Sequence, residues 1–291
     1  MRCDLHVHTV HSGMCTIPVV RRFCRESYND PLAVYEELKR QGMDLVTVTD
    51  HDSIGAAESL RSRPDFFLSE EVTCVMPSGT EIHTGVYGLN ERQHVGIQRR
   101  RGDVEALSAY LREQDLLFSL NHVFSGLTGR RESADFELFE RCFPAIEIRN
   151  GAMLEHANRR AAALARQWGK VPLGGSDAHS MASAGATWTE VPGARSKAEF
   201  LEGLRRGRGA VHGESGRFLK LTADVLQIGF GMMKESRWTL ALAPLALAVP
   251  AVTLLNYVFE ALFLLKWARV AEAGDPASAP LLSGANPEVA A

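Results

Sequence analysis

The stretch "CDLHVHT" at residues 3–9 decides the fold, because it opens a series of seven short β-like runs that alternate with helical stretches. The other runs are "DLVTVTDHD" (44–52), "FFLSEEVTC" (66–74), "EIHTGVYGL" (81–89), "LLFSLNHV" (116–123), "AIEIRN" (145–150) and "VPLGGSDAH" (171–179). Helix-like segments lie between several of them, at 31–41, 103–114 and 152–168. The first has Asp30 as its predicted N-cap, Pro31 at its first position and Gly42 at its end. Strands joined by helical crossovers predict an α/β protein with a parallel barrel or an open sheet.

Histidines and acids stand at or near the ends of these runs. They are His6, His8, Asp50, His51, Asp52, Glu70, Glu71, His83, His122, Asp177 and His179. A lone histidine in a strand is usually an ordinary core or surface residue, but the carboxyl ends of parallel strands converge and would bring this whole group together. Burying so many ionisable groups without a compensating cation is very costly. Imidazole and carboxylate ligands without thiolate predict zinc, manganese or iron.

Bulk composition excludes several classes of protein. The 291 residues are 45% hydrophobic, which is enough for a large core, and the net charge of −3 gives no field that would favour duplex nucleic acid. Five widely spaced cysteines without a C-x-x-C pair argue against a disulfide framework and for a reducing compartment. The polar, patterned start has no secretory signal. We therefore expect a cytoplasmic protein.

The motifs "DLHVHT", "TDHD", "EVT…EIHTGVYG", "NH" and "GSDAH", in this order, resemble the polymerase and histidinol phosphatase (PHP) superfamily over roughly residues 2–212. The resemblance implies a distorted (β/α)7 barrel, of the TIM-like type, at residues 1–215. It also implies a centre of two or three divalent metal ions (Mn, Zn or Fe) and hydrolysis of phosphate esters.

Carried over to this sequence, the resemblance assigns the metal ligands. One ion would be held by His6, His8, Glu71 and Asp177. Glu71 would bridge to a second ion held by His83 and His122, and His51 and His179 would hold a third. The sequence departs from the family at Gly13, where an acid is common. The third site therefore lacks an expected ligand, which His11 or Asp50 would have to replace.

The implied chemistry is phosphoester hydrolysis by a hydroxide between metal ions, without a serine or cysteine nucleophile. We expect Glu71, Asp177 and His179 to be catalytic, with Asp177 or His179 as the alternative proton donor to the leaving group. Arg149 and Asn150 are predicted to bind substrate, against the alternative of a surface salt bridge for Arg149.

Two further acids and the substrate class complete these expectations. Asp50 and Asp52 either orient ligand histidines or cap the turn after their strand. The predicted substrate is a small phosphomonoester, a nucleotide or an oligonucleotide end. The alternative is a non-catalytic PHP module that binds metal for a structural or sensing role.

The C-terminal part differs in composition from the rest. A linker or peripheral helix is expected at 216–237 and a disordered tail at 271–291. Between them, residues 238–265 contain one charge, Glu260, and exceed the length needed to span a bilayer. We expect this segment to attach the protein to a membrane. The alternative is a helix packed on the barrel or in a dimer interface.

Overall fold

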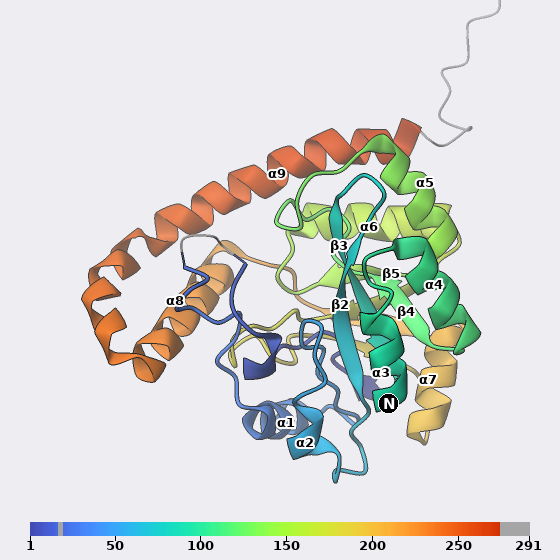
Figure 1. The fold of residues 1–291 in the computed structure, drawn as a ribbon, viewed down its shortest axis with the longest axis horizontal. Helices are drawn as coiled ribbons and strands as arrows, with labels where there is room; N and C mark the ends of the chain where they lie inside the picture. Colours follow the sequence, from blue (N-terminus) through green and yellow to red (C-terminus); the bar gives the residue numbers. More distant parts are fainter. Residues whose placement is uncertain (17–19, 274–291) are drawn as a thin grey trace, which may run out of the picture.

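The computed structural model describes residues 1–16 and 20–273, with an α/β architecture built on two sheets (Figure 1). The larger sheet has the order β2–β3–β4–β5–β6 and the smaller sheet the order β1–β7–β8. The strands are β1 (Arg2–Cys3), β2 (Ser69–Val75), β3 (Glu81–Tyr87), β4 (Leu117–Leu120), β5 (Ala145–Asn150), β6 (Val171–Gly175), β7 (Thr187–Glu190) and β8 (Ala210–Gly213). The prediction of the α/β class is confirmed.

The expectation of an all-parallel sheet is wrong for part of the molecule. Strands β2 and β3 pair antiparallel, as do β3 and β4, whereas β4–β5 and β5–β6 are parallel. Between β2 and β3 lie only residues 76–80, and a parallel pair would need a crossover of about a dozen residues or more. A hairpin was therefore the only connection available at this point.

A closed barrel is not confirmed, because the two sheets are joined by isolated bridges rather than by regular strands. The run at 44–52 forms no extended strand and meets the β2 side of the larger sheet through the parallel bridges Val46–Phe66 and His51–Glu71. The first run meets the other edge beyond β6 through Val7 and Ala178. These bridges bring the ends of the first, second and last runs beside the carboxyl end of the sheet.

Helices lie around the outside of the molecule (Figure 1): the first two pack on the runs at 3–9 and 44–52, and the others lie beside the larger sheet. They are α1 (Pro31–Arg40), α2 (Ala57–Leu60), α3 (Glu91–Gln98), α4 (Val104–Glu113), α5 (Ser133–Cys142), α6 (Glu155–Gln167) and α7 (Lys197–Arg205). All three predicted helices are present, and the Asp30 carboxylate accepts from the backbone N–H of Ala33 as the expected N-cap. Buried aromatic residues such as Phe118, Phe139 and Phe143 fill the core between the sheet and α4–α6.

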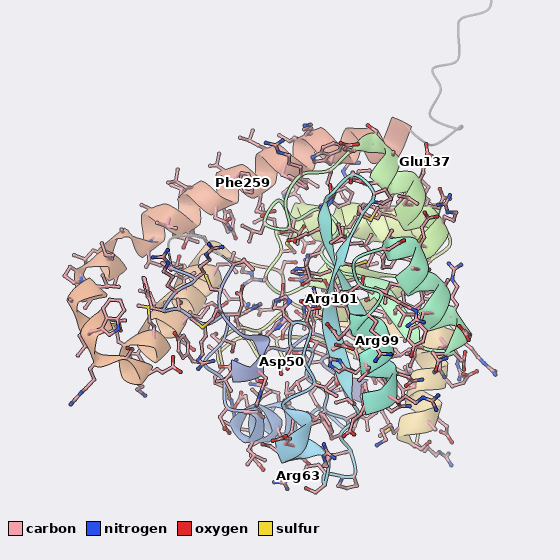
Figure 2. The ribbon with its side chains drawn as sticks, in the orientation of Figure 1. Asp50, Arg63, Arg99, Arg101, Glu137 and Phe259 are labelled. Carbon is pink, nitrogen blue, oxygen red and sulfur yellow. The ribbon has the colours of Figure 1, made fainter. Side chains whose placement is uncertain are left out.

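A long apolar C-terminal arm follows the α/β domain. Helix α8 (Phe218–Glu235) leads into a 3-10 segment (Arg237–Ala248), and α9 (Val249–Ala273) then runs back across the domain (Figure 1). Phe259 lies on this helix, whose side chains are drawn in Figure 2. The expected C-terminal hydrophobic helix is therefore present. It extends to Ala273, and the remainder of the tail predicted at 271–291 lies outside the described residues.

Candidate metal centre

The eight residues predicted as metal ligands are brought to one place. Most of them come from near the end of a β-like run, as predicted, whereas His83 lies near the start of β3, which runs antiparallel to β2. Glu71 on β2 lies at the centre. Its Oε2 is 3.2 Å from His6 Nε2, 3.4 Å from His8 Nε2 and 3.4 Å from His51 Nδ1. Its Oε1 is 3.2 Å from His122 Nε2 and 3.6 Å from His83 Nδ1. One carboxylate therefore faces five imidazoles.

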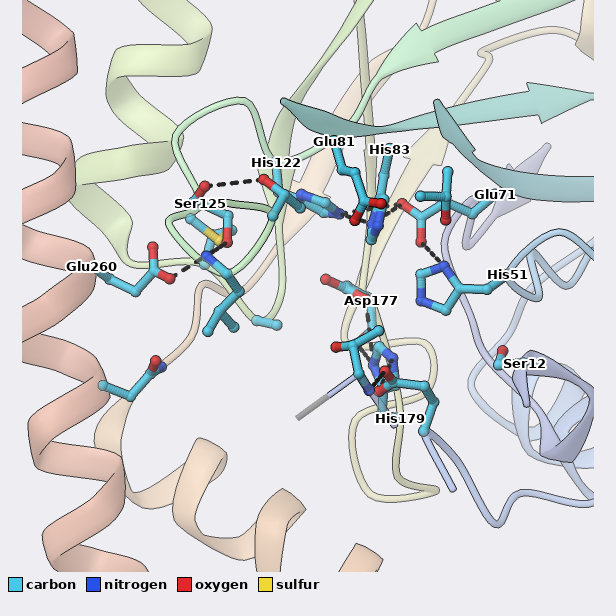
Figure 3. Close-up of a pocket in the computed structure, with 18 of the residues that line it drawn as sticks. Ser12, His51, Glu71, Glu81, His83, His122, Ser125, Asp177, His179 and Glu260 are labelled. Atoms are coloured by element: carbon cyan, nitrogen blue, oxygen red, sulfur yellow. Dashed lines mark hydrogen bonds and ion pairs between the residues drawn. The ribbon is translucent and has the colours of Figure 1, made fainter. Parts of the chain in front are cut away.

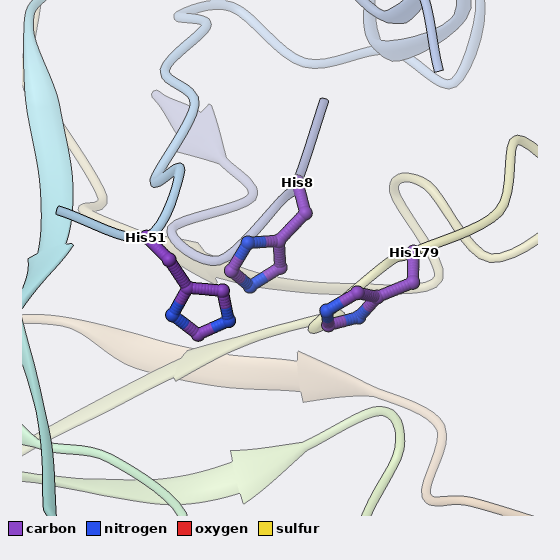
Figure 4. Close-up of side chains that lie close together, drawn as sticks. All are labelled: His8, His51 and His179. Atoms are coloured by element: carbon purple, nitrogen blue, oxygen red, sulfur yellow. The ribbon is translucent and has the colours of Figure 1, made fainter. Parts of the chain in front are cut away.

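A second carboxylate, Asp177, closes the other side of the cluster. Its Oδ1 is 3.5 Å from His6 Nε2, 3.4 Å from His8 Nε2 and 3.4 Å from His179 Nδ1. Figure 3 shows Asp177 and His179 opposite Glu71 and His51, and Figure 4 shows His8, His51 and His179 converging. Four groups have ligand atoms within 4.8 Å of one another: His6/His8/Asp177, His6/Glu71/His122, His51/Glu71/His83 and His8/His51/His179.

Burial and unpaired atoms indicate that this cluster fits cations. His6 and His8 are fully buried, and the Nε2 atom of each has no hydrogen-bond partner, nor does Glu71 Oε2. Burial lowers the pKa of His83 to about 4 and also lowers the pKa of His51 and His179, so these rings are neutral at pH 7 and can offer lone pairs. Burial alone would raise the pKa of Glu71, but the surrounding histidines hold it well below its usual range. Nitrogen and oxygen ligands of this kind suit divalent metal ions.

A second layer of hydrogen bonds orients the ligands. Asp50 accepts from the Ser12 hydroxyl at 2.7 Å, and Ser12 Oγ is 3.0 Å from His8 Nδ1, so Asp50 reaches a predicted ligand histidine through Ser12. Asp52 instead accepts from the backbone N–H of Thr73 and from Arg101. These partners are neither histidines nor part of the turn after the run, so the bonds match neither of the two predicted roles.

Sequence reasoning missed Glu147, which lies on β5. Its Oε1 is 2.8 Å from His6 Nδ1, and its Oε2 accepts from the backbone N–H of His122 and from Asn150 Nδ2. The signal was a single acid between the isoleucines of "AIEIRN", a position that a buried strand normally fills with an apolar residue. Burial alone would lower the pKa of His6, but the carboxylates of Glu71, Asp177 and Glu147 raise it well above its usual value. Because a carboxylate only accepts, the contact with Glu147 keeps a proton on Nδ1, and Nε2 is the atom directed into the cluster.

Backbone strain concentrates at this site. Among the described residues, positive φ angles outside glycine occur at Asp52 (51°), Asp115 (51°), His122 (28°) and Asp177 (52°). Three of these four belong to the cluster or its rim. Such conformations are costly and persist where the surroundings hold them, which is common at functional sites.

An acid other than the one expected at position 13 lies near the predicted third metal site. Gly13 has φ 82° and a Cβ there would meet nothing within 4 Å, while His11 is exposed and does not line the cavity. Glu26 lies at the cavity wall instead, with Oε2 4.0 Å from His179 Nε2 and Oε1 accepting from the N–H of Thr16. The sequence signal was an acid in the long loop after the first run. This acid could not be placed before the loop's path was known.

The two residues predicted to bind substrate have other contacts. Arg149 Nη1 is 3.3 Å from Glu155 and 3.2 Å from the carbonyl of Gly213, and Arg149 does not line the cavity. The ion-pair alternative therefore describes Arg149 better than the substrate contact. Asn150 is buried and donates to Glu147 and to Asp177 Oδ2 at 3.0 Å, so it orients an expected metal ligand.

The cluster opens into a cavity of ≈ 390 Å³. Its polar end is formed by residues of the cluster, including His51, Glu71 and His179. Its other end is lined by the β5–α6 loop, by Leu221 of α8, and by Asn256, Tyr257 and Glu260 of α9. Glu260 accepts from the backbone N–H of Gly126 at 3.0 Å and from the hydroxyl of Ser125, and Figure 3 shows Ser125 beside Glu260. The C-terminal arm is therefore part of the same cavity as the histidines.

Comparisons with known proteins agree with the resemblance noted in the sequence. Residues 155–208 match a family model described as PHP-associated. Among solved structures, the chain is similar to PsfC from Pseudomonas syringae, with TM-score 0.56, 17% identity and coverage of 78% of this chain and 97% of that one. Comparison with curated proteins gave no match.

Two further structures share the fold. An amidohydrolase from Chromobacterium violaceum, solved with sulfate and without metal, gives TM-score 0.51 and 14% identity over 72% of this chain and 97% of that one. The lesion-specific endonuclease PfuEndoQ from Pyrococcus furiosus gives TM-score 0.51 and 16% identity over 72% of this chain and 58% of that one. At these identities the likeness shows the fold alone. Together with the family match, it supports the PHP superfamily predicted from the motifs.

Proposed function

We propose that this protein is a metal-dependent hydrolase of phosphate esters. The observation that carries the proposal is the placement of five histidines around Glu71, with buried ring nitrogens that lack partners in the protein. In this proposal two or three divalent ions (Mn, Zn or Fe) are held by His6, His8, His51, Glu71, His83, His122, Asp177 and His179. Two neighbours of the same fold, an amidohydrolase and an endonuclease, support hydrolysis in general, and the endonuclease supports a phosphate-ester substrate.

When bound, such ions neutralise phosphoryl charge and lower the pKa of water. The remaining work falls to residues of this chain. Glu147 and Asp50 keep His6 and His8 in position, and Asn121 Nδ2 donates to Glu71 Oε1 at 2.8 Å, which fixes the central carboxylate.

Asp177 and His179 are proposed to act at the leaving group. His179 Nδ1 is 3.1 Å from the carbonyl of Asp177, which leaves Nε2 directed toward Glu26. In this arrangement either His179 or Asp177 would take the proton released by the attacking water and pass it to the departing oxygen.

The substrate is proposed to be a small phosphomonoester, a nucleotide or an oligonucleotide end. Arg149 is left out of substrate binding because its guanidinium already has protein partners. We further propose a cytoplasmic location with attachment to a membrane through residues 238–265. Among the described residues, Arg237–Ala268 is the segment long and apolar enough to cross a bilayer.

Metal reconstitution tests the function. Metal-free protein loaded with Mn²⁺, Zn²⁺ or Fe²⁺ is expected to hydrolyse p-nitrophenyl phosphate or short oligonucleotide ends. Glu71→Ala should lose both bound metal and activity, while Glu137→Ala on the outer side of α5 should retain them. Full metal content in Glu71→Ala would contradict the ligand assignment. Bound metal without turnover on any phosphate ester would favour the non-catalytic module.

A further inference from the structure

The C-terminal arm has its polar and apolar sides reversed relative to a helix on a water-soluble protein. Five polar side chains occur in residues 238–265: Thr239, Thr253, Asn256, Tyr257 and Glu260. Each is buried or half-buried, and every exposed residue of this segment is apolar. Only 11% of the most apolar part of Arg237–Ala268 is buried inside the protein. A helix of a soluble core would bury this apolar surface instead.

Specific contacts tie α9 to the α/β domain. Glu260 accepts from the backbone N–H of Gly126, and the Tyr257 hydroxyl donates to the carbonyl of Gly216 at 2.6 Å. Further along the helix, Leu264 and Trp267 are buried in the main core. A helix crossing a bilayer would break these contacts and leave the Glu260 carboxylate in hydrocarbon, which is expensive. An orientation in the plane of the membrane keeps the contacts and embeds only the apolar side.

The exposed surface is suited to lipid rather than to a protein partner. Protein interfaces carry a polar rim, but no polar side chain is exposed between Trp238 and Leu265. Exposed basic residues flank the apolar stretch, with Lys234 and Arg237 at one end and Lys266 at the other. The nearby acid Glu235 is paired with Arg25 at 2.7 Å. This charge pattern complements an anionic membrane surface.

The cavity connects this surface to the histidine cluster. Its ionic end is built from side chains such as Glu71 and His51. At the end beside α8 and α9, the apolar side chains of Met153, Leu154 and Leu221 lie alongside Asn256, Tyr257 and Glu260. A phosphate ester with an apolar substituent matches both ends, because the charged group belongs at the cluster and the substituent beside the apolar residues. A small, fully hydrophilic ester would leave the apolar side chains of Met153, Leu154 and Leu221 without a partner.

We propose that residues 237–268 rest in the plane of a lipid bilayer and that the substrate is an amphiphilic phosphomonoester held in that bilayer. In the reaction, water adds to phosphorus and the bond between phosphorus and the lipid oxygen breaks. That oxygen takes a proton, inorganic phosphate leaves to water, and the lipid alcohol stays in the membrane. The substrate assignment rests on the proposed phosphoesterase function, whereas the bilayer surface does not.

Vesicle flotation of the full-length, metal-loaded protein tests the surface. The protein is expected to float with phosphatidylcholine vesicles that contain phosphatidic acid. The variant Leu255→Asp/Leu262→Asp changes two exposed side chains, 69% and 62% accessible, which do not line the cavity. It should weaken vesicle binding about 100-fold or more, from the lost burial of two leucines. The matched control Val95→Asp on α3, 48% accessible, should bind like the unaltered protein.

Phosphate release tests the substrate. The unaltered protein is expected to hydrolyse phosphatidic acid in vesicles faster than p-nitrophenyl phosphate, and Leu255→Asp/Leu262→Asp should lose only the vesicle activity. Absence of flotation would overturn the bilayer surface, and a dimer dissociated by the double variant would assign that surface to a second copy. Flotation with faster turnover of the soluble ester would overturn the amphiphilic substrate. Flotation with no turnover of either ester would overturn the phosphoesterase function while leaving the surface intact.

Discussion

Replacing Glu147 by glutamine tests whether the cluster depends on the hydrogen bond behind His6. Three donors converge on the two oxygens of this buried carboxylate: His6 Nδ1 at 2.8 Å, Asn150 Nδ2 at 2.9 Å and the backbone N–H of His122 at 3.0 Å. A glutamine amide has one acceptor oxygen and one donor NH₂ group. Whichever way it is placed, the NH₂ group faces at least one donor.

The two placements have different costs. If the amide NH₂ faces His6, the imidazole must accept at Nδ1, which puts its proton on Nε2 and blocks the atom directed at the cluster. If it faces His122 and Asn150, two buried donors lose their acceptor, at a cost of about 1–3 kcal/mol for each unsatisfied group. Loss of a partner behind a metal-ligating histidine typically lowers metal affinity about 10- to 100-fold. That range corresponds to about 1.4–2.7 kcal/mol.

The assay is competition for the metal ion against a chromogenic chelator, with thermal unfolding of the metal-free protein measured in parallel. Glu147→Gln is expected to bind metal about 10- to 100-fold more weakly and to unfold at a lower temperature. Glu137→Gln, the same change at an exposed position on α5, should alter neither property (Figure 2). Unchanged metal affinity in Glu147→Gln would refute the argument that this carboxylate sets the His6 tautomer.

Three further changes probe other parts of the structure. Gly175→Ala would place a Cβ 2.4 Å from the backbone nitrogen of His6. We expect the free energy of unfolding to fall by about 1–3 kcal/mol and metal binding to weaken. A fully stable variant would show that the chain relaxes there. Glu26→Gln should weaken the binding of the ion beside His179, because the Glu26 carboxylate faces that ring, so a chelator should remove this ion before the others. Unchanged metal stoichiometry during chelator titration would remove Glu26 from the site. The hydrogen bond to Glu70 raises the pKa of His94, so this pair stabilises the fold below the unfolded-state pKa of about 6.5 and the contribution is lost as pH rises through the raised pKa. In denaturant unfolding, His94→Gln should therefore cost more stability at pH 6 than at pH 8, and an equal cost at both would contradict the linkage.

Local sequence rules were sufficient for the helices and for the members of the histidine cluster. The cap at Asp30 and the stop after α1 depend on side chains within a few residues of the backbone groups they satisfy. The ligands could be found because strand ends converge in α/β folds whatever the exact pairing. This is why His51 and Glu71 meet even though residues 44–52 do not form a regular strand.

Tertiary structure alone decided the features that depend on distant contacts. The side of α9 that faces the protein is set by Glu260 and Gly126, which are 134 positions apart, so the apolar composition of the segment could not distinguish a crossing helix from one lying on the domain. The path of the first loop brings Glu26 beside His179, and the packing of β5 against the first run places Glu147 behind His6. Sequence patterns report which side chains share a face of one element, but the pairing of faces is a balance of burial, charge and hydrogen bonding over the whole chain.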